Sequence, residues 1–469
     1  MTPRKKPPAL SKKALSALQK AEVEAYVKTG FALQKCGKLD AAIESFCRAL
    51  DLSPEPQKAK CLEWLAQTYL RNNQMDKAED AFRQVIGYDS TNSQAYLFLS
   101  AIHRNRGEYN EARKLMVKGI GLRPDVSPHS KQPADPRPRI LSLRGVENAY
   151  YLLGLSRNGQ RKLKIRGGNF TSRYFVDKSR FDVANFMVLG DNLEQMNDCP
   201  PFAAVLNAIA DPDVEGASLK SVMAYLRHHP QTPVINHPKS VLRTSRDENY
   251  RRFNAIEGVI FPLTIRLIVD EQFIKDPAGR AADLGFEYPI LVRDTGTQTG
   301  RTFAKIEQAD QFCTDIRGRA GREVYLIQFI KTRFHEHYYR KMRAFFIDGK
   351  IYPVVCHIDK MWNVHGSNRT DVMLENPWMM DEEKAYMADP RAHLGDKAYG
   401  ILEQLNKIAQ LDFCGVDFTL RGDGTFQIYE LNPAMRHSFD HARKFPYLQP
   451  YYTVISRAFS DMIERKISG

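Results

Sequence analysis

Residues 415–436, with the sequence GVDFTLRGDGTFQIYELNPAMR, predict two short strands joined by a tight turn. Side chains in a strand switch faces at every residue. If the loop holds an even number of residues, Asp417, Glu430 and Asn432 fall on one face. An apolar set then packs on a core from the other face: Val416, Phe418, Leu420, Tyr429 and Leu431.

Two carboxylates and a carboxamide on one face offer oxygen ligands to Mg²⁺, which usually binds one or two carboxylates together with substrate phosphates. An ordinary half-exposed hairpin shows the same alternation, so the pattern alone leaves both interpretations open. The order Asp-Phe, a turn with Asp-Gly, then Glu-Leu-Asn-Pro resembles the metal-binding end of the ATP-grasp superfamily, of the glutathione-synthetase type. The resemblance implies that Asp417, Glu430 and Asn432 hold Mg²⁺ against the phosphates of ATP.

The bulk composition indicates several domains and no membrane span. The chain has 469 residues, 43% of them hydrophobic, and no apolar run long enough to cross a bilayer. The seven cysteines are scattered without a Cys-x-x-Cys pair, which favours reduced thiols in a cytoplasm. The net charge of +13 comes without a nucleic-acid docking motif, so nucleic acid is an unlikely partner.

Residues 21–124 contain an internal repeat, preceded by a basic tail over 1–20. Ala66 and Ser100 stand at equivalent positions 34 residues apart, and Gly30 is their counterpart in the first unit. Three such units resemble tetratricopeptide repeats, which are helix–turn–helix pairs with a period of about 34 residues. Such a stack suits a peptide or partner protein; the alternative is a packing or dimerisation module. The larger residues expected to fill the seams are Phe46, Phe82 and Met116.

Proline-rich residues 125–138 predict a linker. Residues 139–235 then predict a small α/β lobe with a parallel sheet, because strands and helices alternate. This matches the lobe that precedes the nucleotide-binding part of ATP-grasp ligases. The expected strands are 139–143, 170–175, 184–189 and 233–236, and the expected helices are 147–155, 201–210 and 218–229.

Residues 236–469 resemble the nucleotide-binding and catalytic domain of the same superfamily. Arg246 stands in a predicted helix, and Arg293 ends a predicted strand, where relatives often have lysine. The following loop carries Gly296 and Gly300, whose backbone amides can approach phosphate oxygens. The resemblance implies ATP contacts from all four residues, since arginine also binds phosphate. A solvated basic face is the alternative for Arg246.

The apolar strand 323–330 resembles the hinge of the superfamily, which implies that Gln328, Phe329 and Ile330 meet the adenine of ATP. An ordinary buried strand is the alternative. Arg343 precedes an Asp-Gly hairpin turn and matches the arginine that reaches the phosphates and the developing acyl phosphate. It is therefore the predicted catalytic residue, which stabilises charge in the transition state.

Arg436 and His437 follow Asn432-Pro433 directly and are predicted to bind substrate; a surface loop is the alternative. The predicted fold is multidomain: an all-α tetratricopeptide repeat stack, an α/β lobe and an α+β ATP-grasp fold. The resemblance implies an ATP- and Mg²⁺-dependent carboxylate–amine ligase that works through an acyl phosphate, on a peptide or protein recruited by the repeats. The alternatives are a repeat scaffold with a nucleotide-sensing or inactive lobe, and a kinase. Neither the acid nor the amine can be read from the sequence.

Overall fold

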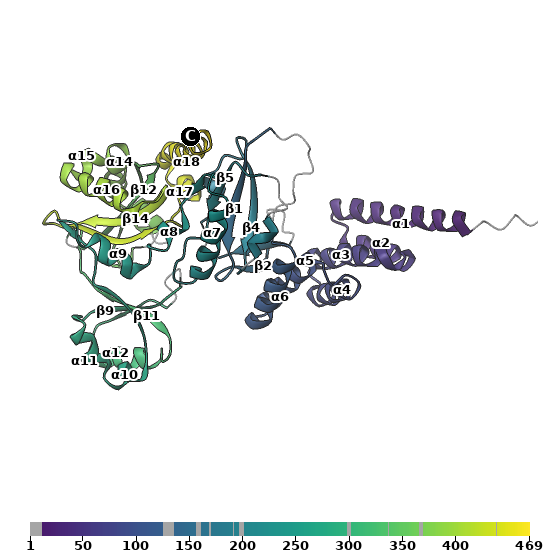
Figure 1. Ribbon diagram of the computed structural model, residues 1–469, viewed down its shortest axis with the longest axis horizontal. Helices are drawn as coiled ribbons and strands as arrows, with labels where there is room; N and C mark the ends of the chain where they lie inside the picture. The colour runs from purple at the N-terminus through teal and green to yellow at the C-terminus, as the bar shows by residue number, and fades with distance from the viewer. Residues whose placement is uncertain are drawn as a thin grey trace, which may run out of the picture. The chain divides into compact units, whose positions relative to one another are not determined.

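The computed structural model describes residues 12–124, 136–155, 161–167, 170–190, 192–196, 201–297, 302–335, 337–364, 369–437 and 439–469. They form two compact units (Figure 1). One unit takes the described residues of 1–125 together with 149–167, and the other takes those of 126–148 and 168–469. Most of the predicted linker, 125–135, and the first part of the basic tail, 1–11, lie outside the described residues.

The first unit contains the predicted repeats. Its helices pack in consecutive pairs, which confirms the helix–turn–helix period, and the first helix begins within the predicted tail. The pairs are α1 (Lys12–Lys35) with α2 (Leu39–Leu52), α3 (Glu55–Arg71) with α4 (Met75–Tyr88), and α5 (Ser93–Asn105) with α6 (Tyr109–Leu122).

Small residues let the helices of a pair approach closely, as the sequence predicts. A Cβ atom at Gly30 would lie 2.7 Å from the ring of Phe46, which is fully buried. Gln34 of α1 and Thr68 of α3 are separated by one period of the repeat. Gln34 donates a buried hydrogen bond of 2.5 Å to Thr68, which ties neighbouring repeats together. The equivalent residues of the other repeats are also buried: Ala66, Phe82, Ser100 and Met116.

We expect Gly30→Ala to destabilise the first repeat, although alanine is the better helix former. The added methyl group must displace the Phe46 ring, and overpacking of this kind costs about 1–3 kcal/mol. Gly87→Ala in α4 is the matched control, because nothing lies within 4 Å of its Cβ position. Native-state hydrogen exchange of α1 and α2 amides measures the effect. Equal opening free energies in the two variants would contradict the close approach.

A β-hairpin completes the first unit. Strands β2 (Tyr150–Leu155) and β3 (Arg161–Arg166) pair antiparallel and pack mainly on α5, with further contacts to α3 and α6. The helix predicted over 147–155 is therefore wrong. Tyr151 and Leu153 are buried while Leu152 between them is less so, which is the period of a strand with one face on a core.

The second unit opens with a parallel sheet in the order β4-β1-β5-β6. The predicted α/β lobe is confirmed, but residues 204–207 are a strand and not a helix, because a fully buried parallel strand is a short apolar run without alternation. Residues 172–174 form a 3₁₀ turn where a strand was predicted. The elements are β1 (Arg139–Gly145), η1 (Ser172–Tyr174), β4 (Asp182–Val188), η2 (Asn192–Met196), β5 (Ala204–Asn207), α7 (Gly216–His228) and β6 (Val234–Ile235).

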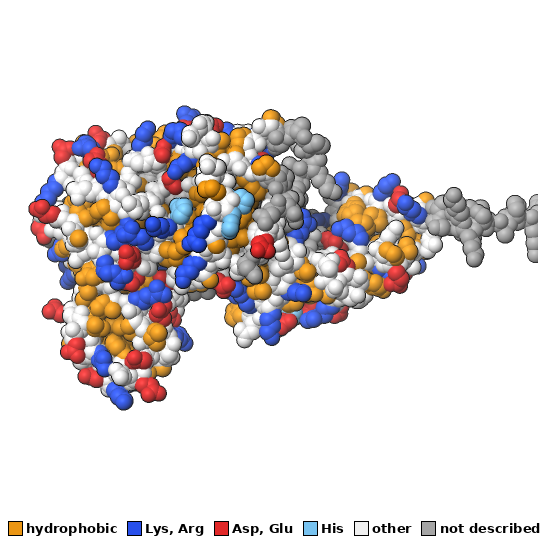
Figure 2. Space-filling model, in the orientation of Figure 1, with side chains coloured by type: hydrophobic (Ala, Val, Ile, Leu, Met, Phe, Trp, Pro, Cys, Tyr) orange, Lys and Arg blue, Asp and Glu red, His pale blue; other side chains and the backbone are white. Residues whose placement is uncertain are grey.

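A second sheet, antiparallel in the order β10-β9-β11-β8, forms a small lobe whose helices cover one face of the sheet (Figure 1). Acidic and basic side chains mix over its visible surface (Figure 2). Its elements are β8 (Thr264–Ile268), α10 (Glu271–Lys275), α11 (Pro277–Asp283), β9 (Ile290–Asp294), β10 (Ala304–Ile306), α12 (Ala309–Arg317) and β11 (Glu323–Gln328). Short helices α8 (Pro238–Val241) and α9 (Arg246–Phe253) precede this lobe.

The third sheet has the order β13-β12-β14-β15-β7 and contains the stretch over 415–432. Its strands are β7 (Val259–Ile260), β12 (Tyr339–Ile347), β13 (Lys350–Asp359), β14 (Phe413–Leu420) and β15 (Phe426–Asn432). The remaining helices are α13 (Arg369–Leu374), α14 (Pro377–Ala388), α15 (Pro390–Leu394), α16 (Asp396–Ala409), α17 (Phe439–Lys444), η3 (Pro446–Leu448) and α18 (Gln449–Ser468). Several of them share the large apolar core of this unit with the sheet.

Two further findings bear on the predicted setting of the protein. Among the described residues, no helix is both long enough and apolar enough to cross a membrane. The cysteines in the described part of the chain carry free thiols.

Candidate functional site

The hairpin of β14 and β15 brings Asp417, Glu430 and Asn432 to one face. A β-bulge is the cause, and not the even loop that the sequence analysis assumed. Leu420 pairs with Phe426, so the loop between them holds five residues, an odd number. The pairing then shifts by one residue next to Asp417, which leaves Tyr429 as the extra residue of a β-bulge. Because of this shift Asp417 lies opposite Glu430. Tyr429, predicted to face the core, instead lines the cavity described below.

Asp417 is almost fully buried and is bound by an arginine of the neighbouring strand. Arg343 pairs with it in register across β12 and β14 and donates two hydrogen bonds, Nε to Oδ1 at 2.6 Å and Nη2 to Oδ2 at 2.8 Å. The Nζ atom of Lys341, two residues earlier on the same face, is 3.7 Å from Oδ2. Burial raises the pKa of the Asp417 carboxyl, but the two cations outweigh it, so the pKa lies below its usual value.

Glu430, whose side chain is 32% exposed, is likewise bound by an arginine. Arg246, the first residue of α9, places Nη2 2.8 Å from Glu430 Oε1, and Asn432 Nδ2 donates to the same oxygen at 3.1 Å. Burial again raises the pKa of the carboxyl, and Arg246 and Arg293 together lower it below the usual value. Burial and the neighbouring charge of Arg246 lower the pKa of the Arg293 guanidinium to about 10, so Arg293 stays charged at neutral pH.

These groups form one end of a cavity of about 400 Å³ between the second and third sheets. We call this end the phosphate end; it consists of Arg246, Arg293, Lys341, Arg343, Asp417, Glu430 and Asn432. Four cations here face two carboxylates, an excess of positive charge that an anionic ligand would balance. Lysine and arginine side chains also gather on the visible face where the lobes of these two sheets adjoin (Figure 2).

The other end of the cavity, which we call the aromatic end, is lined by Phe303, Phe329 and Trp362. The Trp362 ring lies 5.4 Å from Phe329 and 5.8 Å from Phe303, measured between centroids. Lys305 Nζ lies 4.2 Å from the centroid of Phe329. An apolar end and a charged end in a cavity of this size suit a ligand with a flat ring and an anionic group. Trp362 stands in a loop, where no periodic pattern in the sequence could have identified it.

The predicted hinge residues Gln328, Phe329 and Ile330 all line this cavity. The Gln328 side chain bonds on both sides to the backbone of Glu287, with Nε2 donating to the carbonyl at 2.9 Å and Oε1 accepting from the amide at 3.0 Å. The Gln328 side chain therefore ties the end of β11 to the backbone before β9. Because both its polar atoms are used in these bonds, it is not free to bind a ligand. Lys341, which the sequence analysis did not assign, shares the Arg343 face at a spacing of two residues, a signal that could have identified it.

A smaller cavity of about 60 Å³ adjoins the phosphate end and shares Arg246, Arg293, Glu430 and Asn432 with it. Its wall includes Gly296, which has a φ of +65° and whose Cβ would lie 2.1 Å from Val214. Gly296 thus contacts the loop after β5, while Gly300 lies outside the described residues. The structure does not test the predicted phosphate contacts of these glycines.

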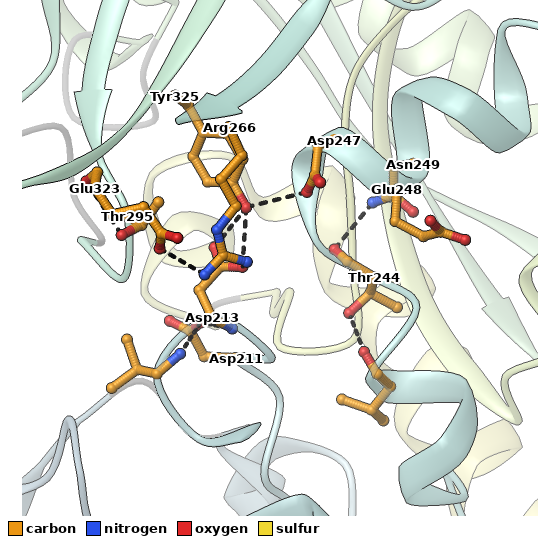
Figure 3. Close-up of polar contacts among 12 residues, drawn as sticks. Asp211, Asp213, Thr244, Asp247, Glu248, Asn249, Arg266, Thr295, Glu323 and Tyr325 are labelled. Carbon is orange, nitrogen blue, oxygen red and sulfur yellow. Dashed lines mark hydrogen bonds and ion pairs between the residues drawn. The ribbon is translucent and has the colours of Figure 1, made fainter. Parts of the chain in front are cut away.

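Acidic residues beside this smaller cavity are held by a tyrosine and an arginine (Figure 3). Tyr325 Oη donates to both oxygens of Asp213 at 2.9 Å, and Arg266 Nη1 donates to Asp213 Oδ1 at 3.1 Å. Arg266 also binds Glu323 at 2.6 Å. Burial raises the pKa of Asp213 despite these partners. The cluster joins the loop after β5 to strands β8 and β11.

Neither of the predicted substrate residues, Arg436 and His437, lines the two cavities described above. The His437 side chain is 2% exposed and lies among aromatic rings, with the Phe175 centroid at 4.6 Å and Tyr452 at 4.9 Å. Burial lowers the pKa of His437 to about 4. His437 therefore lies in the apolar core and does not face either cavity. Arg436 is exposed, and its carbonyl oxygen accepts a hydrogen bond of 3.2 Å from Arg343 Nη1.

The donor set at the phosphate end fits Mg²⁺ only together with a phosphate ligand. Among the described residues, no group of three or more His, Cys, Asp and Glu side chains could hold a metal ion. Asp417 and Glu430 offer two carboxylates and Asn432 a carboxamide, all hard oxygen donors, and Mg²⁺ bound with phosphates needs no more. In this structure Arg343 and Arg246 neutralise the two carboxylates.

We expect Arg343→Met to destabilise the protein more at pH 8 than at pH 4.5. Without the guanidinium, burial raises the pKa of Asp417 above that of the unfolded chain, and such a group adds stability only at low pH. Only Lys341, at 3.7 Å, would then remain beside the buried carboxylate. Removing one partner of a buried ion pair costs up to about 3 kcal/mol, and this cost fades as Asp417 is protonated. Urea unfolding at the two pH values measures this difference, with Arg343→Lys as the charge-preserving control. A loss independent of pH would contradict the role of Arg343.

A tetratricopeptide-repeat family model matches residues 30–95 and 65–125. No curated protein matches the sequence. Three similar solved structures are MamA, a RimK domain protein ATP-grasp from Sphaerobacter thermophilus DSM 20745 and D-alanyl-alanine synthetase A from Vibrio cholerae O1 biovar eltor str. N16961.

MamA is 24% identical with a TM-score of 0.21; the similarity covers 24% of this chain and 66% of MamA, just short of two thirds. The RimK domain protein is 14% identical with a TM-score of 0.41, covering 69% of this chain and 99% of that one. The synthetase is 14% identical with a TM-score of 0.43, covering 72% and 100%. These TM-scores are below 0.5, so we base the function on the cavity itself. The chain joins a tetratricopeptide-repeat domain to a region whose structural neighbours are ATP-grasp ligases, as its sequence predicts.

Proposed function

We propose that this protein is an ATP-dependent ligase that joins a carboxylate to an amine, acting on a peptide or protein recruited by its repeats. The observation that supports this most is the two-ended cavity, with aromatic rings at one end and four cations, two carboxylates and an asparagine at the other. Adenine suits the aromatic end and a triphosphate suits the phosphate end. Free thiols in the described cysteines agree with work in a reducing cytoplasm.

In the proposed reaction a substrate carboxylate oxygen attacks the γ-phosphorus of ATP, ADP leaves and an acyl phosphate forms. The amine nitrogen then attacks the acyl carbon, phosphate leaves, and the nitrogen gives up a proton to yield the amide. Phosphoryl transfer depends mainly on positioning and charge stabilisation. In this proposal Arg293 and Arg343 would hold the transferring group, and Arg246 and Lys341 would add positive charge beside it; all four side chains line the cavity.

Asp417, Glu430 and Asn432 would hold Mg²⁺, which when bound neutralises phosphate charge. The same chain keeps both carboxylates ionised at neutral pH, because their pKa values lie below the usual ones. Arg343 and Arg246 already contact these carboxylates, so each guanidinium is within reach of an anionic group bound there.

Calorimetric titration of a non-hydrolysable ATP analogue, with and without Mg²⁺, tests the site. We expect Mg²⁺-dependent binding that Glu430→Gln weakens about tenfold or more, a loss of about 1.4 kcal/mol or more. Glu257→Gln removes a charge from an exposed glutamate outside both cavities and is the matched control. Absence of binding with and without Mg²⁺ would overturn the proposal, and a stable phosphoester product in place of released phosphate would identify a kinase.

Trp362 provides an optical signal for the aromatic end. We expect an adenine nucleotide to change tryptophan emission in the wild type and in Trp378→Phe, but not in Trp362→Phe, because only Trp362 of the two lines the cavity. Fluorescence titration with the ATP analogue measures this. A signal that survives Trp362→Phe would place the ring of the nucleotide elsewhere.

A further inference from the structure

The β2–β3 hairpin has an apolar face on the repeats and a polar face directed away from that contact. Across the antiparallel pair, Tyr151 lies opposite Ile165 and Leu153 opposite Leu163. Tyr151 and Leu153 are 3% and 5% exposed, which marks the face packed on the repeats. In a strand the residues between these point the other way. They include Lys162, Lys164 and Arg166 of β3, which we call the cationic face.

Polar contacts at its edges fix the hairpin on the repeats. The Leu153 amide donates to Asn105 Oδ1, at the end of α5, at 3.2 Å. Arg161 donates Nε and Nη2 to Asn73 Oδ1 at 2.9 and 2.6 Å, in the turn after α3. The Arg104 guanidinium stacks on Tyr150 at 4.1 Å. Because of these buried apolar residues and hydrogen bonds, the hairpin packs as an integral part of the repeat unit.

Among the described residues, the cationic face has no acidic partner. Lys164 bonds to the Leu155 carbonyl oxygen, and Arg166 Nη1 lies 3.5 Å from the Ile165 carbonyl oxygen. In the part of the chain that the structure describes, neither these two nor Lys162 forms an ion pair with a carboxylate. Lys162 and Arg166 are exposed. Three cations thus stand in one row, and their charge is not neutralised by a carboxylate of the described residues.

The spacing of the row selects the shape of an anionic partner. Alternate residues of a strand are about 6.7 Å apart, which is also the spacing of alternate side chains in an extended peptide. β3 pairs only with β2 among the described strands, so its outer edge can accept an added strand. Single-stranded nucleic acid would also need aromatic faces for its bases. Tyr150 is the one aromatic residue on this face, and Arg104 already covers it.

We propose that the cationic face of the hairpin, Lys162, Lys164 and Arg166, binds an extended acidic segment of a partner protein, with alternate glutamate or aspartate side chains meeting the row. This binding is separate from the proposed ligase reaction and requires neither ATP nor Mg²⁺. The repeat unit would thus bind an acidic partner through a strand of the hairpin and not through its helices.

Fluorescence anisotropy with the full chain tests the proposal. The probe is a labelled peptide of about ten residues with glutamate at alternate positions, and its glutamine counterpart is the control. We expect the glutamate peptide to bind and the glutamine peptide not to, with affinity that falls as NaCl rises from about 50 to about 200 mM. K162E/K164E/R166E should weaken binding by about tenfold or more.

The matched control K220E/K397E/K407E reverses three exposed lysines of α7 and α16, with the same change in net charge, and should stay within about twofold. K162Q/K164Q/R166Q keeps the test valid if charge reversal disturbs folding. Absence of binding, equal losses in both reversed variants, or binding of a single-stranded oligonucleotide but not the glutamate peptide would each overturn the proposal. The hairpin variants should still bind the ATP analogue, so failure here is distinct from failure of the ligase proposal.

Discussion

The candidate site depends on a single extra residue in β15. With a regular pairing from Leu420 to Asp417, the carboxylate of Asp417 would lie opposite Tyr429, and Glu430 and Asn432 would point to the apolar side of the sheet. The bulge at Tyr429 moves the pairing by one residue and turns both side chains to the face of Asp417. Leu431 and Val416 stay buried on the other side. The bulge thus lets one hairpin bury its apolar side chains in the core and present its polar side chains at the site.

Once the carboxylates share a face, the buried Asp417 and the half-buried Glu430 require compensating charge. Asp417 and Glu430 each have an arginine within 2.8 Å, and these arginines come from elements far apart in the sequence, β12 and α9. The pairs therefore also tie these elements to the hairpin. Lys341 shares Asp417 with Arg343, and Arg293 lies near Glu430, which Arg246 already binds; desolvation lowers the pKa of Lys341 and Arg293. Four cations therefore share two carboxylates, and this excess of positive charge is the physical reason to propose an anionic group such as phosphate there.

The sequence predicted what local patterns determine and missed what tertiary contacts determine. The sequence predicts the repeats from a fixed period with small residues such as Gly30 and Ala66. In the structure the helices follow this period, and both small residues lie where helices pack closely. The residues Asp417, Glu430 and Asn432 were predicted correctly to share a face, but on an assumption of an even loop that the structure corrects. The burial of His437 could not be predicted, because its aromatic neighbours come from distant segments such as η1 and α18.

The hairpin β2–β3 shows why the domain organisation could not be read in chain order. A two-stranded hairpin is marginally stable in water by itself, so its apolar face needs another surface. The helices of the repeats supply that surface, although the hairpin lies in sequence between β1 and β4 of the second unit. The chain therefore passes between the two units after the repeats, before β2 and after β3. Two of these passages border one strand pair, so residues 149–167 belong by their packing to the repeat unit although the sequence on both sides of them belongs to the second unit.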